Sequence, residues 1–163
     1  YHFDQETKSM TRYYFIIFFI LITSVINTKP IYNENQLQLL LYNHSRITKG
    51  FPTILGINFY DNKEGKVLQL EFETDSIKTE TMILTMNSLA KVGQFSKTPF
   101  KNFIVINHYK GSDIPISYKS NANCAINYFV KNQITKKSWM KNCLSNSITE
   151  KETQNWSELN FRK

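Results

Sequence analysis

The sequence is poor in the residues that build cross-linked, metal-stapled or fibrous proteins: it has 2 cysteines, 5 glycines and 4 prolines among 163 residues. Two cysteines are too few for a structural zinc module with four thiolate ligands or for a disulfide-dense mini-protein. The low glycine and proline content excludes a collagen-like or low-complexity chain. Since 41% of the residues are hydrophobic and only 20% are charged, the chain can form a packed core.

Local catalytic motifs are lacking as well. The sequence contains no Gly-rich phosphate loop, dinucleotide fingerprint, His-Glu-x-x-His zinc pair, nucleophile elbow or EF-hand loop. We therefore expect no cofactor and no metal ion. The leading prediction for function is a non-enzymatic interaction or accessory module.

The longest uncharged apolar run is Tyr13–Ile26, with the sequence YYFIIFFILITSVI. A helix of this length rises about 21 Å, short of the roughly 30 Å hydrocarbon core, which is typical of a signal peptide. Extended to Thr11–Thr28, with Arg12 and Lys29 snorkelling at its ends, it nearly spans a bilayer. A cleaved signal peptide and a retained membrane anchor both stay open. A buried helix of a soluble domain is disfavoured because the run is apolar on every face.

Either favoured alternative delivers the rest of the chain across a membrane, so the sequence predicts a membrane-anchored or secreted, extracytoplasmic protein. The predicted organisation has three parts. Residues 1–30 form an N-terminal extension with the signal peptide or membrane anchor, residues 31–146 form a single α+β domain, and residues 147–163 form a polar C-terminal tail.

Apolar residues at helical spacing predict four helices in the domain, which are Glu34–Ser45, Ile77–Val92, Ala122–Gln133 and Lys136–Leu144. Asn33, Asn121 and Thr135 can cap three of them. Asp75 or Ser76 can cap the helix that begins at Ile77.

Four runs with strand-like patterns alternate with these helices: Thr53–Tyr60, Lys66–Thr74, Phe103–Tyr109 and Ile114–Lys119. Apolar residues on both faces of the third run predict a central strand, and Pro115 predicts that the fourth is an edge strand. The order α-ββα-ββα-α predicts a small antiparallel or mixed four-stranded sheet with helices on one face.

Cys124 lies opposite the apolar stripe of its predicted helix, and Cys143 lies in the last predicted helix. A short last helix packed over that outer side would bring the two sulfurs together, and an extracytoplasmic compartment would keep them oxidised. We therefore predict a disulfide between them, which stabilises the fold by about 3 kcal/mol on the chain-entropy model. Two separate thiols, or a nucleophilic pair of Cys124 with His108, are the alternatives.

The net charge of +7 is unevenly distributed, because residues 91–141 carry nine lysines and one acid, Asp113. This stretch predicts a basic surface that attracts an anionic lipid or an acidic protein. The absence of arginine from the stretch disfavours nucleic acid. Solvated lysines without a partner are the alternative interpretation. The candidate binding residues are Lys97, Lys101, Lys110, Lys119, Lys131, Lys136, Lys137 and Lys141.

One arrangement of residues resembles a catalytic site. His108 lies on the predicted central strand, and Asp113 follows across the predicted turn, with Ser112 and Ser117 nearby. These residue types could support a small extracytoplasmic hydrolase. A histidine packed at the edge of the sheet is the structural alternative.

Glu71 and Glu73 lie on one face of the second predicted strand, about 6.8 Å apart by the strand rise. That face is predicted to be in water, where neither carboxyl would gain the raised pKa that a general acid needs. We therefore interpret both side chains as solvated.

Overall fold

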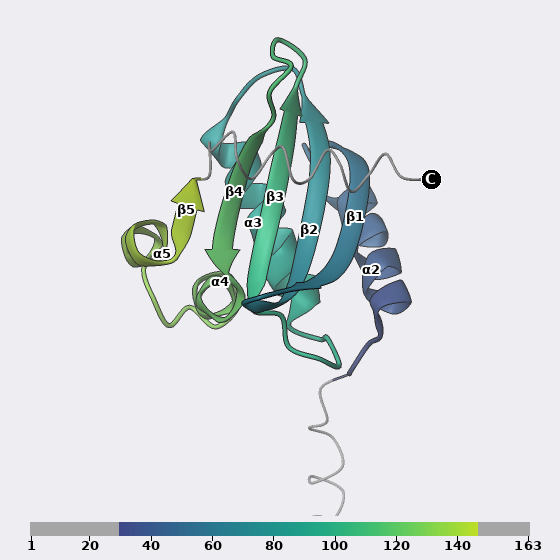
Figure 1. The fold of residues 1–163 in the computed structure, drawn as a ribbon, viewed down its shortest axis with the longest axis vertical. Helices are drawn as coiled ribbons and strands as arrows, with labels where there is room; N and C mark the ends of the chain where they lie inside the picture. Colours follow the sequence, from purple (N-terminus) through teal and green to yellow (C-terminus); the bar gives the residue numbers. More distant parts are fainter. Residues whose placement is uncertain (1–29, 147–163) are drawn as a thin grey trace, which may run out of the picture. The chain divides into compact units, whose positions relative to one another are not determined.

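The computed structural model describes residues 30–146, and in this part of the chain it has an α+β fold with four helices and a mixed five-stranded sheet (Figure 1). The predicted α+β class is confirmed. The predicted signal peptide or anchor at Tyr13–Ile26 lies outside the described residues. The elements are α2 (Glu34–Ile47), β1 (Thr53–Asn62), β2 (Gly65–Thr74), α3 (Thr79–Gly93), β3 (Asn102–Tyr109), β4 (Ile116–Asn121), α4 (Ala122–Phe129), α5 (Lys136–Asn142) and β5 (Leu144–Asn146).

The strands lie in the order β1-β2-β3-β4-β5. β2 and β3 run parallel, and α3 connects them, whereas the other neighbouring pairs are antiparallel. A parallel pair needs such a crossover connection, because a tight turn can join only antiparallel strands. β3 therefore lies at the centre of the sheet, as its two apolar faces predict.

The prediction of four strands was wrong, because β5 adds a fifth strand that pairs with β4 between Tyr118 and Ser120. Three residues are too few to show an alternating pattern. The prediction that the fourth strand is an edge strand was also wrong. β4 begins at Ile116, directly after Pro115, so the proline stays outside the ladder and β5 can cover that edge.

The cap of α2 is as predicted: Asn33 Oδ1 accepts from the backbone N–H of Gln36 at 3.0 Å, and Gln36 Oε1 accepts from that of Asn33 at 2.9 Å. α3, in contrast, begins at Thr79 rather than Ile77, and it has no side-chain cap. The carboxylate of Asp75 forms an ion pair with Lys110 instead.

α4 is shorter than predicted and ends at Phe129 instead of Gln133. Beyond it the backbone turns, because Asn132 adopts a φ of 54° and the N–H of Gln133 donates to Asn127 O at 2.8 Å. The last helix ends at Asn142, which leaves Leu144 free to enter β5.

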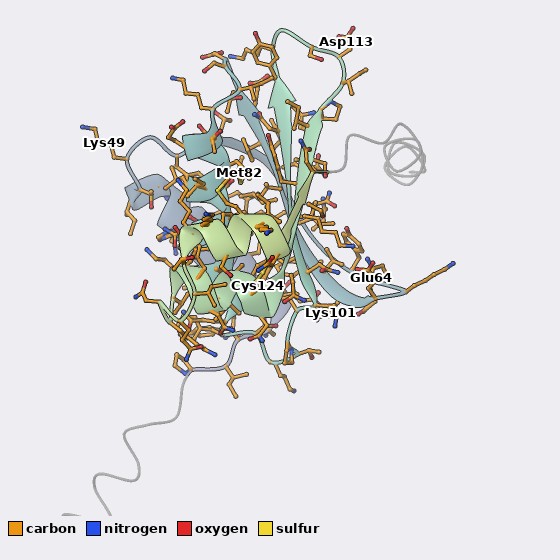
Figure 2. The ribbon with its side chains drawn as sticks, turned by 90° about the vertical axis from the view of Figure 1, so that its left-hand side faces the viewer. Lys49, Glu64, Met82, Lys101, Asp113 and Cys124 are labelled. Atoms are coloured by element: carbon orange, nitrogen blue, oxygen red, sulfur yellow. A yellow bond between two sulfur atoms is a disulfide. The ribbon has the colours of Figure 1, made fainter. Side chains whose placement is uncertain are left out.

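The main core lies between the sheet and the helices, which Figure 2 shows on one side of the sheet. Leu68, Leu70 and Phe72 are fully buried there, as the alternation in β2 predicts. α3 packs closely on this layer, since a Cβ on Gly93 would lie 2.7 Å from the Phe103 ring. A larger residue at that position would push α3 away from β3.

Candidate functional site

The end of the domain formed by α4 and α5 carries the clearest candidate surface. Helices of eight and seven residues are too short to be stable alone. Side-chain caps fix where they begin: Asn121 accepts from Cys124 N at 3.1 Å, and Thr135 accepts from Ser138 N at 3.2 Å. Their position against the sheet must come from tertiary contacts.

The first of these contacts is the predicted disulfide between Cys124 and Cys143, which is confirmed, with a Cα–Cα distance of 6.2 Å. It joins α4 to the residue that follows α5. The carbonyl of Cys143 also accepts from the N–H of Asn121 at 3.2 Å. The cystine therefore fixes both ends of the loop that contains α5.

The second contact is Trp139, whose side chain is completely buried. Its ring stacks on Tyr128 at a centroid distance of 5.3 Å and meets Phe129 edge-on at 4.8 Å. The indole Nε1 donates to the Ser120 hydroxyl at 3.0 Å, so the only polar atom of the buried side chain is satisfied. The sequence did not reveal this anchor, because two helical turns are too short to define a buried face by periodicity.

Since Trp139 faces inward, the opposite side of α5 faces outward. Lys136, Met140, Lys137 and Lys141 fall within an arc of about 140° at roughly 100° per residue. All four side chains are exposed, and together they line a shallow hollow of about 590 Å³. We call these four residues the α5 surface.

The lysines of the α5 surface have no acidic partner among the described residues. Among residues 30–146, no carboxylate oxygen lies within 4.0 Å of the Nζ atom of Lys136, Lys137 or Lys141. The same holds for Lys131, which is exposed in the connection between α4 and α5. This end of the domain therefore presents positive charge that no carboxylate of the described residues compensates.

Other candidate lysines are compensated. Lys110 Nζ lies 2.9 Å from Asp75 Oδ1 and 3.8 Å from Glu73 Oε2. The hydrogen bond with Asp75 raises the pKa of Lys110, and the same bond lowers the pKa of Asp75. Lys110 is thus held in its charged form by its own neighbours.

Lys119 is compensated in the same way by Glu64, in the turn between β1 and β2. Glu64 Oε2 accepts from Lys119 Nζ at 2.6 Å and from Asn102 Nδ2 at 2.7 Å, and these bonds lower the pKa of Glu64. Lys97 and Lys101 are exposed and form no ion pair within residues 30–146, and Lys101 lies beside Glu64 in Figure 2. A continuous basic surface over residues 91–141 stays a prediction.

The candidate catalytic pair is not brought together. Asp113 is exposed at the tip of the β3–β4 loop, and no hydrogen bond or ion pair within residues 30–146 links it to His108 (Figure 2). His108 Nε2 instead lies 3.3 Å from Glu71 Oε2. The two side chains are 40% and 19% exposed. Glu71, which the sequence analysis took to be solvated, is therefore the acid beside the histidine.

Glu71 is the centre of a polar cluster on the face of the sheet away from the helices. Its Oε1 accepts from Asn58 Nδ2 at 3.1 Å and from Gln69 Nε2 at 2.8 Å, and Gln69 Oε1 accepts from the Tyr60 hydroxyl at 3.1 Å. Gln69 is only 2% exposed. The interpretation of this face as wet was therefore wrong around Gln69 and Glu71, because side chains of β1 reach across it.

Two further features are absent from residues 30–146. No group of three or more His, Cys, Asp or Glu side chains there is arranged to hold a metal ion. Helices long and apolar enough to cross a bilayer are likewise not found in that stretch.

Comparisons with known proteins give no relative. No protein family, no curated protein and no solved structure matches this chain.

Proposed function

We propose that this protein is a non-enzymatic interaction module, membrane-anchored or secreted, that binds an anionic partner through the α5 surface. One observation carries the proposal: three exposed lysines lie on one side of a fixed helix, and no described carboxylate compensates them. Clustered like charges repel one another, so an anion bound there relieves an unfavourable interaction.

The way in which α5 is held favours binding. The buried Trp139 and the cystine fix the backbone that carries the lysines, so less conformational entropy is lost when a partner binds. Lysine presents a compact charge on a flexible stem, without the planar fork of arginine. The α5 surface is therefore suited to closely spaced anionic groups in varied arrangements rather than to one defined bidentate contact.

The proposed extracytoplasmic location rests on the disulfide, since such bonds persist mainly in oxidising compartments. The apolar run Tyr13–Ile26 supports the same location as a sequence prediction. Intact mass and N-terminal sequencing of the cellular protein, with and without reductant, test both points. We expect a mass increase of about 2 Da on reduction, from the two hydrogens gained by the sulfurs, and a membrane-bound or secreted product.

Binding is tested with a soluble polyanion, poly-glutamate, at low and high salt. The triple variant Lys136→Gln/Lys137→Gln/Lys141→Gln should lose at least tenfold in affinity, because each lost ionic contact weakens electrostatic binding. The matched control is Lys49→Gln/Lys63→Gln/Lys78→Gln, which removes the same charge at exposed positions elsewhere. Equal losses in both variants would mean that only net charge matters, and the α5 surface would have no special role.

A small hydrolase is a second candidate function, and the contact between His108 and Glu71 favours it. A carboxylate can orient an imidazole that acts as a general base. The test is turnover of a p-nitrophenyl ester by the purified protein. If the histidine is a general base, His108→Ala and Glu71→Gln should reduce turnover by about a hundredfold or more, with Asp113→Asn unchanged. Turnover that is absent, or unaffected by His108→Ala, eliminates this candidate.

A further inference from the structure

The α5 surface combines positive charge with an exposed apolar side chain. Met140 lies between Lys136 and Lys137 in angular position around the helix, and it remains 38% exposed. The long methylene stems of the three lysines line the same hollow. An apolar centre surrounded by cationic tips is the pattern of side chains that meet a lipid headgroup region, where the stems are buried and the charges stay in water.

The position of α5 leaves this side free of the rest of the domain. Figure 1 shows α5 beside β5, at the opposite end of the sheet from α2. Within residues 30–146, its main contacts are with α4 and β5, through the side that carries Trp139. A planar surface can therefore approach the lysines without meeting α2 or β1.

Deepening the proposed function, on which this inference rests, we propose that the α5 surface docks on a membrane that contains anionic lipid. Charge complementarity requires an anionic occupant, and Met140 distinguishes a membrane from an acidic protein. A fluid headgroup layer accepts a single exposed methionine without a shaped pocket, whereas a protein partner would need a complementary cavity for it. Lysines without arginine also fit headgroups that rearrange around point charges.

Each residue of the α5 surface is expected to add modestly to the affinity for an anionic membrane, and together the residues add considerably. Each lysine close to an anionic surface strengthens binding by roughly fivefold, so three give on the order of a hundredfold. Burial of the exposed part of Met140 adds about fivefold. The charge contribution falls steeply with salt, and the methionine contribution does not.

The test measures acetylation of each lysine by mass spectrometry on the full chain. Vesicles of phosphatidylcholine with 30% phosphatidylglycerol are compared with phosphatidylcholine alone and with soluble poly-glutamate. We expect anionic vesicles to slow acetylation of Lys136, Lys137 and Lys141 at least fivefold, with reversal in 0.5 M salt. Lys49, Lys63 and Lys78 serve as internal controls and should react at unchanged rates. Because the readout is local to α5, attachment of the chain by another segment does not imitate it.

Met140→Ser separates the lipid inference from the proposed function. We expect it to weaken protection by anionic vesicles about fivefold and to leave protection by poly-glutamate unchanged. Protection by poly-glutamate but not by anionic vesicles would overturn the lipid inference and leave the proposed function standing. Equal protection by neutral vesicles would also overturn the lipid inference. Protection by neither probe would overturn both.

Discussion

The sheet and the α4–α5 end of the domain both carry lysines, but the two regions differ in whether a carboxylate lies next to the lysine. Lys66 and Lys119, on strands, meet carboxylates at 2.5 Å and 2.6 Å, and Lys110, directly after β3, meets one at 2.9 Å. The three lysines of the α5 surface meet none among the described residues. Counting charges along the sequence therefore overstates how basic the surface of the sheet is. It also does not identify α5 as the place where the lysines lack a described carboxylate partner.

The two regions also differ in what holds them together. The sheet is joined by backbone ladders between five strands, so no single side chain carries it. The α4–α5 end instead depends on one cystine and on the cluster around Trp139. Substitutions at these few side chains should therefore destabilise the α4–α5 end more than the sheet.

The largest effect is expected at Trp139. Trp139→Ala leaves a cavity beside Tyr128 and removes the indole N–H that donates to the Ser120 hydroxyl, and should lower the free energy of unfolding by about 3–5 kcal/mol. Trp139→Phe keeps an aromatic ring and should cost clearly less. Denaturant unfolding monitored by circular dichroism gives both values, and a Trp139→Ala loss below about 1 kcal/mol would show that the cluster does not anchor α5.

Removal of the disulfide should have the next largest effect. The double variant Cys124→Ser/Cys143→Ser should lose about 3 kcal/mol, because the unfolded chain is no longer constrained. Hydrogen exchange should then rise more in α5 than in β2, because the cystine holds α5 and the ladders hold β2. A uniform rise across the domain would mean that the two regions are not held separately.

A smaller effect is expected in the polar cluster on the sheet. Glu71→Ala removes the acceptor for the amide of Gln69, which is 2% exposed, and should cost about 1–3 kcal/mol in unfolding free energy. Glu73→Ala, on the same strand but 39% exposed, is the control and should cost less than about 0.5 kcal/mol. Similar losses in the two variants would argue that the cluster does not stabilise the sheet.

The smallest effect on stability is expected where a lysine is paired with a carboxylate, as Lys119 is with Glu64. The hydrogen bond from Lys119, followed by that from Asn102, lowers the pKa of Glu64 from its usual 4.5. The unfolded chain therefore binds more protons at acid pH, and stability should fall as the pH drops from above 4.5 through the folded-state pKa. Glu64→Gln should flatten this dependence slightly in unfolding curves measured between pH 7 and pH 3. An unchanged slope would indicate that the contact of Glu64 with Lys119 does not persist in solution.

The elements with regular patterns were predictable from the sequence. The alternation of Leu68, Leu70 and Phe72 predicted a half-buried strand, and all three are buried in the core. The position of Cys124 opposite the apolar stripe of its helix, together with a predicted oxidising compartment, led to the prediction of a disulfide with Cys143. This disulfide is confirmed. In the first case the signal was a local period of two residues, and in the second it was the presence of two cysteines in a chain predicted to be extracytoplasmic.

The remaining features depend on contacts between distant segments. The partner of His108 is Glu71, 37 residues earlier, and β2 and β3 are placed side by side only after α3 crosses over. The antiparallel register of β1 on β2 pairs Asn58 with Gln69, and the amide of Asn58 donates to Glu71 from there. Counting charges along the sequence likewise does not predict an ion pair such as that between Lys119 and Glu64, which are 55 residues apart.

The most direct test of the contrast between paired and unpaired lysines is competitive acetylation of each lysine in the free protein at neutral pH and low salt. The raised pKa of Lys110, caused by its hydrogen bond with Asp75, leaves less reactive free amine. We predict that Lys136, Lys137 and Lys141 react several-fold faster than Lys110 and Lys119, and that the difference shrinks in high salt. Equal rates at low salt, or faster reaction on the sheet, would contradict the assignment of the free positive charge to α5.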